Sequence, residues 1–279
     1  MLAPLFMNEI FFGQKNFLTT QENFLQKLNP YMLTHENWEI MKNTKAPPQL
    51  PVLSVSPELT KTPVLSQVFK PNMKDTLFWC MYAANNGIGY FQTQIEKGVN
   101  MINLMMNEKK KMSDHFNKTP ALLKNSNHKI TLSKINEICC NLMTKPTMDS
   151  IDSCIPCAIY YNRPVYVYYK EIHSFLKFSD KNYVSDSEED TNIILLYANG
   201  GKISLETDTT KVLEFIKMTT NLFCLNTYEK PLSGISNYKT EELKQLYTIV
   251  FESDEILKKP EYYEKILVKC TAVVNEKIY

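Results

Sequence analysis

The chain has 279 residues, of which 44% are hydrophobic, and its 31 basic residues nearly balance its 30 acidic ones. This composition is typical of a globular protein and excludes a disordered or fibrous one. No stretch approaches the roughly 18 uninterrupted apolar residues that a membrane span needs, and the N-terminus lacks the pattern of a secretory signal peptide. We therefore expect an intracellular protein that makes no contact with a membrane.

Residues 1–71 are predicted to form an arm and a linker. Apolar residues at helical spacing over 14–43, interrupted at Pro30, predict two short helices, so we assign 1–44 to an N-terminal helical arm. Prolines then follow at high density, and 45–71 is predicted to be an extended linker or a segment that wraps the core.

Residues 72–228 are predicted to form an α+β core domain. Asp75 is a candidate N-cap, and the residues 77–82 that follow make a helix that is apolar nearly all round, which indicates burial. Apolar residues over 90–118 recur every three or four positions, the pattern of one long amphipathic helix. Two further helices are expected over 132–143 and 148–161.

The hydrophobic pattern changes from helical to strand-like near residue 164. Runs rich in β-branched and aromatic residues at 164–169 and 192–197 predict strands, and the Ala-Asn-Gly-Gly stretch 198–201 before a further run at 202–205 predicts a β-hairpin. We therefore expect a small antiparallel sheet packed on helices. An acidic loop over 185–190 and a helix capped by Asp208 or Thr209 complete the predicted domain.

Residues 229–279 are predicted to form a C-terminal helix–extended loop–helix. Thr240 is expected to cap the first helix, and the second is expected to begin at Pro260. Two short helices bury little surface alone, so this element should dock onto the rest of the chain or onto a partner. The predicted fold class is therefore α+β, helix-rich, with a small antiparallel sheet and this C-terminal pair.

The seven cysteines are odd in number and are expected to be free thiols. Cys154 and Cys157 form a C-x-x-C pair that could bind zinc together with Cys139 and Cys140. Adjacent cysteines on a helix point in different directions and chelate poorly, so buried thiols are the favoured interpretation. Phosphate-binding and metalloprotease motifs are absent from the sequence, and we expect no cofactor.

Lysines are concentrated over 97–129, where seven of them stand against two acids, a net charge of +5 in an otherwise neutral chain. A solvated helix face explains this pattern, and so does weak binding of nucleic acid. Only Arg163 is an arginine, which leaves lysine point charges for phosphate and disfavours the reading of base sequence. The candidate nucleic-acid-binding residues are Lys97, Lys109, Lys110, Lys111, Lys118 and Lys124.

A cysteine peptidase of papain-like or OTU-like type is the alternative function. Cys80 lies on an apolar helix with strands far downstream, the layout that those enzymes use, and His173 is the candidate base because acidic residues lie near it in sequence. A nucleophilic cysteine needs a lowered pKa. Cys80 follows the predicted cap by five residues, where the helix dipole helps little, so packing in the core is the competing interpretation.

Two stretches carry a family resemblance. Lys74-Asp75-Thr76-Leu77-Phe78-Trp79-Cys80 and the tail stretch Lys230-Pro-Leu-Ser-Gly-Ile-Ser-Asn-Tyr-Lys239 resemble uncharacterised proteins of large nucleocytoplasmic DNA viruses of the giant-virus kind. The tail is also similar to helix hairpins of the SAP and Rho N-terminal type. The resemblance implies no defined activity, but it does imply a virion or virus-factory location in the host cytoplasm. We therefore expect a non-enzymatic structural or interaction protein whose partners are other viral proteins, with weak lysine-mediated nucleic-acid binding.

Overall fold

The computed structural model of the chain describes residues 68–183 and 192–278. These residues belong to the second of the two compact units into which the chain divides, which spans 65–279. The helices predicted over 14–43, the acidic loop 185–190 and most of the predicted linker lie outside the described residues. No helix among the described residues is long and apolar enough to cross a bilayer.

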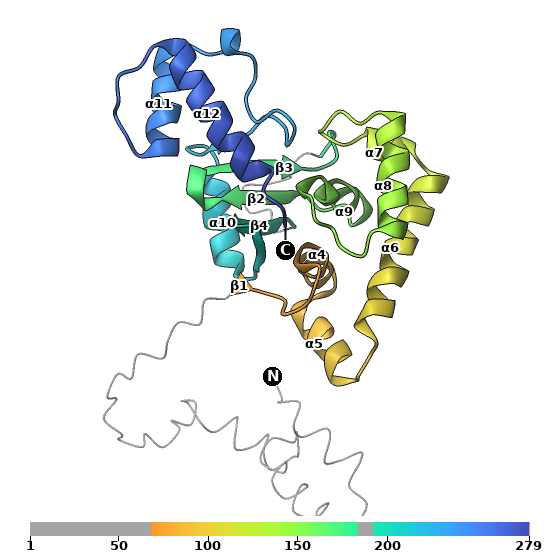
Figure 1. Cartoon of the computed structure of the whole chain (residues 1–279). Helices are drawn as coiled ribbons and strands as arrows, with labels where there is room; N and C mark the ends of the chain where they lie inside the picture. The colour runs from red at the N-terminus through yellow and green to blue at the C-terminus, as the bar shows by residue number, and fades with distance from the viewer. Residues whose placement is uncertain (1–67, 184–191, 279) are drawn as a thin grey trace, which may run out of the picture. The chain divides into compact units, whose positions relative to one another are not determined.

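The described unit has the expected α+β class, with helices around one sheet (Figure 1). The α-helices are α4 (Thr76–Asn86), α5 (Ile88–Glu96), α6 (Met101–Lys118), α7 (Ala121–Lys124), α8 (Leu132–Thr144), α9 (Cys154–Tyr160), α10 (Thr209–Met218), α11 (Thr240–Phe251) and α12 (Lys259–Val274).

The sheet has the strand order β1-β5-β4-β2-β3-β6. Its strands are β1 (Val68–Phe69), β2 (Val165–Tyr169), β3 (Ser174–Phe178), β4 (Ile194–Asn199), β5 (Lys202–Glu206) and β6 (Phe223–Cys224). The sheet is mixed rather than wholly antiparallel, because β2–β4 and β3–β6 are parallel pairs. The reason is β3, which the sequence did not predict. β3 pairs antiparallel along one side of β2 and so returns the chain to the end where β2 begins. β4 then pairs along the other side of β2 in the parallel sense.

The predicted hairpin is confirmed. β4 and β5 pair antiparallel, and Gly200 and Gly201, the two residues between them, have φ values of 56° and 69°. Positive φ at both central positions is the backbone of the tight turn that matches the strand twist, and glycine adopts it without steric cost. The predicted cap of α10 is also confirmed, since the Asp208 side chain accepts a hydrogen bond from the Thr210 N–H at 2.9 Å.

Both faces of the sheet are covered. Val165, Val167 and Tyr169 of β2 face the larger core cluster, which includes α4, α6, α8 and α9. The alternate residues Tyr166 and Tyr168 face a smaller cluster beneath α10. This period of two is what a strand requires when it is buried on both sides.

The predicted buried helix is confirmed in α4. Asp75, in the left-handed backbone region, accepts a hydrogen bond from the Phe78 N–H at 3.2 Å, and Gly87 ends the helix. Every residue from Leu77 to Ala83 is buried. α4 therefore lies inside the body, against β5.

The single long helix predicted over 90–118 is wrong, because α5 and α6 are separate. Gly98, with φ of 65°, follows α5, and its N–H donates to the Ile95 carbonyl at 2.9 Å. Asn100 then caps α6 by accepting from the Asn103 N–H. A glycine in the left-handed region followed by an Asn cap is a local stop-and-start signal that the continuous apolar spacing concealed.

The helix predicted over 148–161 is shorter than expected. A 3-10 turn, Ile151–Ser153, precedes α9, and Pro156 lies at the third position of that helix. Proline is tolerated only in the first turn, because it lacks the N–H that a later position donates. The start of α9 is therefore close to this proline.

The C-terminal helix pair is confirmed and docks onto the body. Buried residues of α11 and α12, including Leu243 and Ile266, belong to the same core cluster as β2. Beyond α12, the Ile278 N–H donates to the Asp149 carbonyl at 3.2 Å. Thr240 is the first helical residue of α11 rather than its cap; the Lys239 N–H before it donates to the Glu242 carboxylate at 2.7 Å.

Candidate functional site

Cys80 lies in the core of the protein. Its exposed fraction is 0%, and burial raises its pKa to about 12. A nucleophilic cysteine needs the opposite shift, together with an imidazole within hydrogen-bond reach. No hydrogen bond joins the Cys80 thiol to a histidine of the described residues. The geometry does not supply what the peptidase hypothesis requires.

His173 has other partners. It lies between β2 and β3 in the left-handed backbone region, with φ of 46°. Its Nδ1 is 3.3 Å from the Tyr168 hydroxyl, and its Nε2 is 3.4 Å from the Glu252 carboxylate after α11. Because Glu252 belongs to the C-terminal helix pair, its contact with the His173 ring links that pair to the sheet.

Cys154 and Cys157 are fully buried in α9, and burial raises the pKa of both thiols. Cys139 is also buried, whereas Cys140 is exposed. No group of three or more metal-ligating side chains occurs among the described residues. The C-x-x-C pair therefore packs as two small apolar groups.

Lys109 is not on the basic surface where the sequence placed it. Its exposed fraction is 1%, and its Nζ lies 2.6 Å from Asp75 Oδ2 and 3.2 Å from the Pro146 carbonyl. Lys109 lies on the buried face of α6, together with the apolar residues Met105, Met112 and Phe116. Its contact with Asp75 spans 34 residues of sequence, which no local pattern signals.

The other five candidate lysines are exposed. They are Lys97, Lys110, Lys111, Lys118 and Lys124. Lys111 pairs with Glu108 at 3.0 Å, and this bond raises the pKa of Lys111. Without Lys109, the segment 97–129 presents six lysines and two acids, a net charge of +4. We call these 33 residues the lysine segment.

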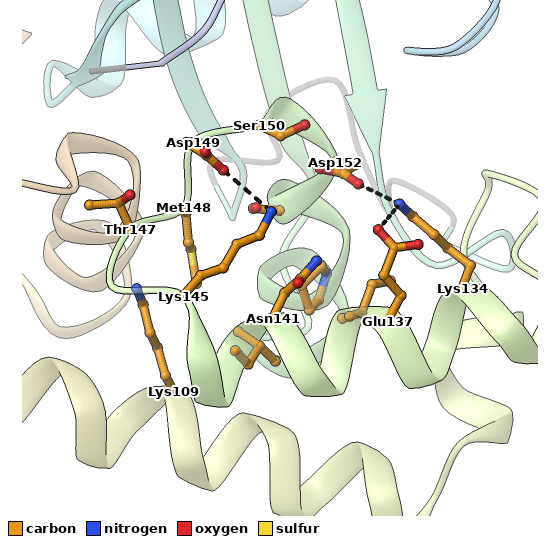
Figure 2. Close-up of a pocket in the computed structure, with 14 residues that line it drawn as sticks. Lys109, Lys134, Glu137, Asn141, Lys145, Thr147, Met148, Asp149, Ser150 and Asp152 are labelled. Atoms are coloured by element: carbon orange, nitrogen blue, oxygen red, sulfur yellow. Dashed lines mark hydrogen bonds and ion pairs between the residues drawn. The ribbon is translucent and has the colours of Figure 1, made fainter.

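A cavity of about 220 Å³ lies between α8 and the segment that leads into α9 (Figure 2). Its charged lining residues are Lys109, Lys134, Lys145, Glu137, Asp149 and Asp152. Lys134 pairs with Glu137 and Asp152, both at 2.9 Å, and Lys145 lies 3.7 Å from Asp149. Because its lysines and carboxylates are equal in number and paired, the cavity offers an anion no net charge.

Aromatic side chains border the lysine segment, a feature that the sequence analysis missed. His115 of α6 packs edge-to-face on Tyr160 of α9, with ring centroids 5.5 Å apart. The Tyr90 side chain of α5 is half exposed. The three rings come from three helices separated by up to 70 positions, so no short motif could have brought them together.

Comparisons of the chain with family models, with curated proteins and with solved structures find no match. The residues and their geometry therefore carry the functional argument.

Proposed function

We propose that this chain is a non-enzymatic interaction protein that binds nucleic acid weakly through the lysine segment. The single observation that carries the proposal is the exposure of five of its six candidate lysines on a segment of net charge +4, in a chain of net charge +1. Phosphate backbones gain affinity from such a surface by releasing counterions.

Within the described residues, the two other candidate sites are less suited to their proposed chemistry. The lysines of the cavity in Figure 2 are neutralised by carboxylates, and the cysteine of the peptidase hypothesis is buried. Over 229–279 eight lysines stand against nine acids, so the C-terminal pair gains little from counterion release. Its buried contacts suit a docking element.

The expected affinity is low and depends steeply on salt. Lysine is a point charge without the planar fork of arginine, so each phosphate contact is electrostatic and unspecific. Two or three contacts on a single strand predict a slope of about −1.4 to −2.1 in log affinity against log salt. Sequence preference should be absent.

The test measures the binding of the full chain to a fluorescein-labelled 20-mer oligonucleotide by fluorescence anisotropy at 25 to 200 mM KCl. The variant K110Q/K118Q/K124Q removes three exposed charges of the lysine segment and should lose most of the affinity and most of the salt slope.

The matched control removes three exposed lysines elsewhere. The variant K230Q/K244Q/K277Q makes the same change in net charge on the C-terminal part and should bind like the parent protein. Equal loss in both variants, or no binding of the parent protein at 25 mM KCl, would overturn the proposal.

The virion or virus-factory location implied by the giant-virus resemblance stays a prediction, as do viral partner proteins. It is tested by locating the tagged protein in infected cells and in purified virions.

A further inference from the structure

Three aromatic rings lie at the surface beside the lysine segment. Tyr90, on the helix α5 that packs on α4, is 50% exposed. Tyr160 is partly buried, and its ring lies 5.5 Å from that of the exposed His115. We call Tyr90, His115 and Tyr160 the ring cluster.

Lys111 connects the ring cluster to the lysine segment. His115 is four residues after it, so both side chains lie on one face of α6. Glu108 contributes most to the raised pKa of Lys111, and Tyr160 and Tyr90 add to this shift. Lys118 follows His115 by three residues and continues this face toward the end of the helix.

The Tyr160 ring is held in place by other aromatic rings. Tyr160 packs against the buried Phe116 with a centroid distance of 6.3 Å and against Tyr161 at 5.3 Å. The supporting helices belong to the main core cluster. A ring that is already oriented loses little side-chain entropy when a flat partner stacks on it.

Rigid exposed rings next to lysines are the combination that single-stranded nucleic acid recognises. Bases stack on aromatic faces, while lysines lie along the phosphates. A duplex buries the faces of its bases in its own stack and offers its backbone and the base edges in its grooves, but no base face. Glu108 pairs with Lys111 and so reduces the local positive charge. Base stacking should therefore contribute a larger share of the affinity here.

We propose that the ring cluster binds single-stranded nucleic acid, with bases stacked on Tyr90, His115 and Tyr160 and phosphates beside Lys111 and Lys118. This inference rests on the proposed function and adds the strandedness of the ligand and the residues that select it. The bound strand should show no strong preference among base sequences, because every base has a face that stacks.

The experiment compares three probes on the full chain at 50 mM KCl: dT12, a 12-base-pair duplex, and a 12-unit abasic strand that has the phosphates of dT12 without its bases. The expected order is dT12 tightest and the abasic strand weaker by at least about five- to a hundred-fold, the effect of one stacked base.

Two variants separate stacking from a change in fold. Y90A/H115A removes two exposed rings and should reduce dT12 binding to the level of the abasic strand, while Y90F/H115F retains the rings and should bind dT12 like the parent protein. Both positions are exposed, so both variants should fold. A 5-iodouracil strand should crosslink to the ring cluster on irradiation.

The outcomes distinguish the two proposals. Equal binding of dT12 and the abasic strand, or of dT12 and the duplex, overturns base stacking and leaves the lysine proposal standing. Retention of dT12 binding by Y90A/H115A also overturns it. If none of the three probes binds at 50 mM KCl, nor when the measurement is repeated at 25 mM KCl, the proposed function and this inference are overturned together.

Discussion

Lys109 and Lys111 lie two positions apart on α6, and each pairs with one carboxylate, yet their surroundings are opposite. The Lys109 side chain is 1% exposed and that of Lys111 66% exposed. Each residue turns the helix by about 100°, so two positions carry a side chain from the core face to solvent. A run of identical charged residues can therefore contain both a core residue and a surface residue.

The buried pair is part of a satisfied network. Asp75 uses Oδ2 for Lys109 and Oδ1 for the Phe78 N–H at the start of α4. The Lys109 ammonium donates also to the Pro146 carbonyl and lies 5.5 Å from the centre of the Phe78 ring. One ion pair thus joins the start of α4, the middle of α6 and the segment after α8. Such a network is costly to break, because a remaining partner is a buried charge.

The largest expected effect is the difference in reactivity between the buried and the exposed cysteines. Cys80, Cys139, Cys154, Cys157 and Cys270 are buried, whereas Cys140 and Cys224 are exposed. A thiol reagent such as DTNB should modify Cys140 quickly and Cys224 more slowly in the folded protein, because partial burial raises the pKa of the Cys224 thiol, and it should modify seven thiols in denaturant. Buried thiols react only after the core opens, at a cost that approaches the global stability of about 5–15 kcal/mol.

Rapid labelling of Cys80 in the folded protein would contradict its burial and revive the peptidase hypothesis. The variant C140S/C224S provides the control, since it should show no fast phase.

The second prediction breaks the buried ion pair. K109M leaves Asp75 buried without its cation and should lower the free energy of unfolding by about 3–5 kcal/mol. Asparagine can still cap a helix, so D75N/K109M should recover part of this loss. Urea unfolding followed by circular dichroism measures both.

The neighbouring variant K110M is the control, because Lys110 is exposed and should change stability by no more than about 0.5 kcal/mol. Equal stabilities of K109M and K110M would show that the contrast between the two faces of α6 is wrong.

The third prediction concerns the effect of the buried His128 on stability at low pH. His128 is 3% exposed between Phe178 and Tyr228; its Nε2 lies 2.9 Å from the Lys177 carbonyl, and its buried Nδ1 has no hydrogen-bond partner among the described residues. Burial lowers the pKa of His128. Below pH of about 6.5 the unfolded chain therefore binds a proton that the folded protein rejects, and stability falls with decreasing pH by at most about 1.4 kcal/mol per unit.

The measurement is the free energy of unfolding between pH 7.5 and 5. The slope below pH 6.5 should become shallower in H128Q and stay unchanged in H115Q, which alters an exposed ring. Identical slopes in H128Q and the parent protein would exclude His128 as the group responsible.

The smallest effect belongs to the exposed pair. Glu108 and Lys111 lie three residues apart, and K111Q should cost only about 0–1 kcal/mol of stability, an effect that 1 M salt should abolish. A loss as large as that of K109M would mean that exposure does not govern the strength of these pairs.

Parts of the fold could be predicted because their causes are local. The Asp75 cap, the apolar run that follows it and the two glycines between β4 and β5 each act within a few residues. The strand β3 was missed, because Ser174–Phe178 is identified only by its pairing with β2 and β6. Exposure was predicted for all six candidate lysines. It is correct for five, and Lys109 is buried because of its contact with Asp75, 34 residues away in the sequence.

The sequence by itself determined where α4 and α10 start, where the hairpin turns and how much positive charge lies over 97–129, since caps, turn residues and composition act over short distances. Only the tertiary structure decided which lysine is buried, which thiols are sealed in the core and which rings of α5, α6 and α9 meet at the surface. The physical reason is that burial depends on packing between segments distant in the chain, and a single side chain cannot encode its eventual neighbours.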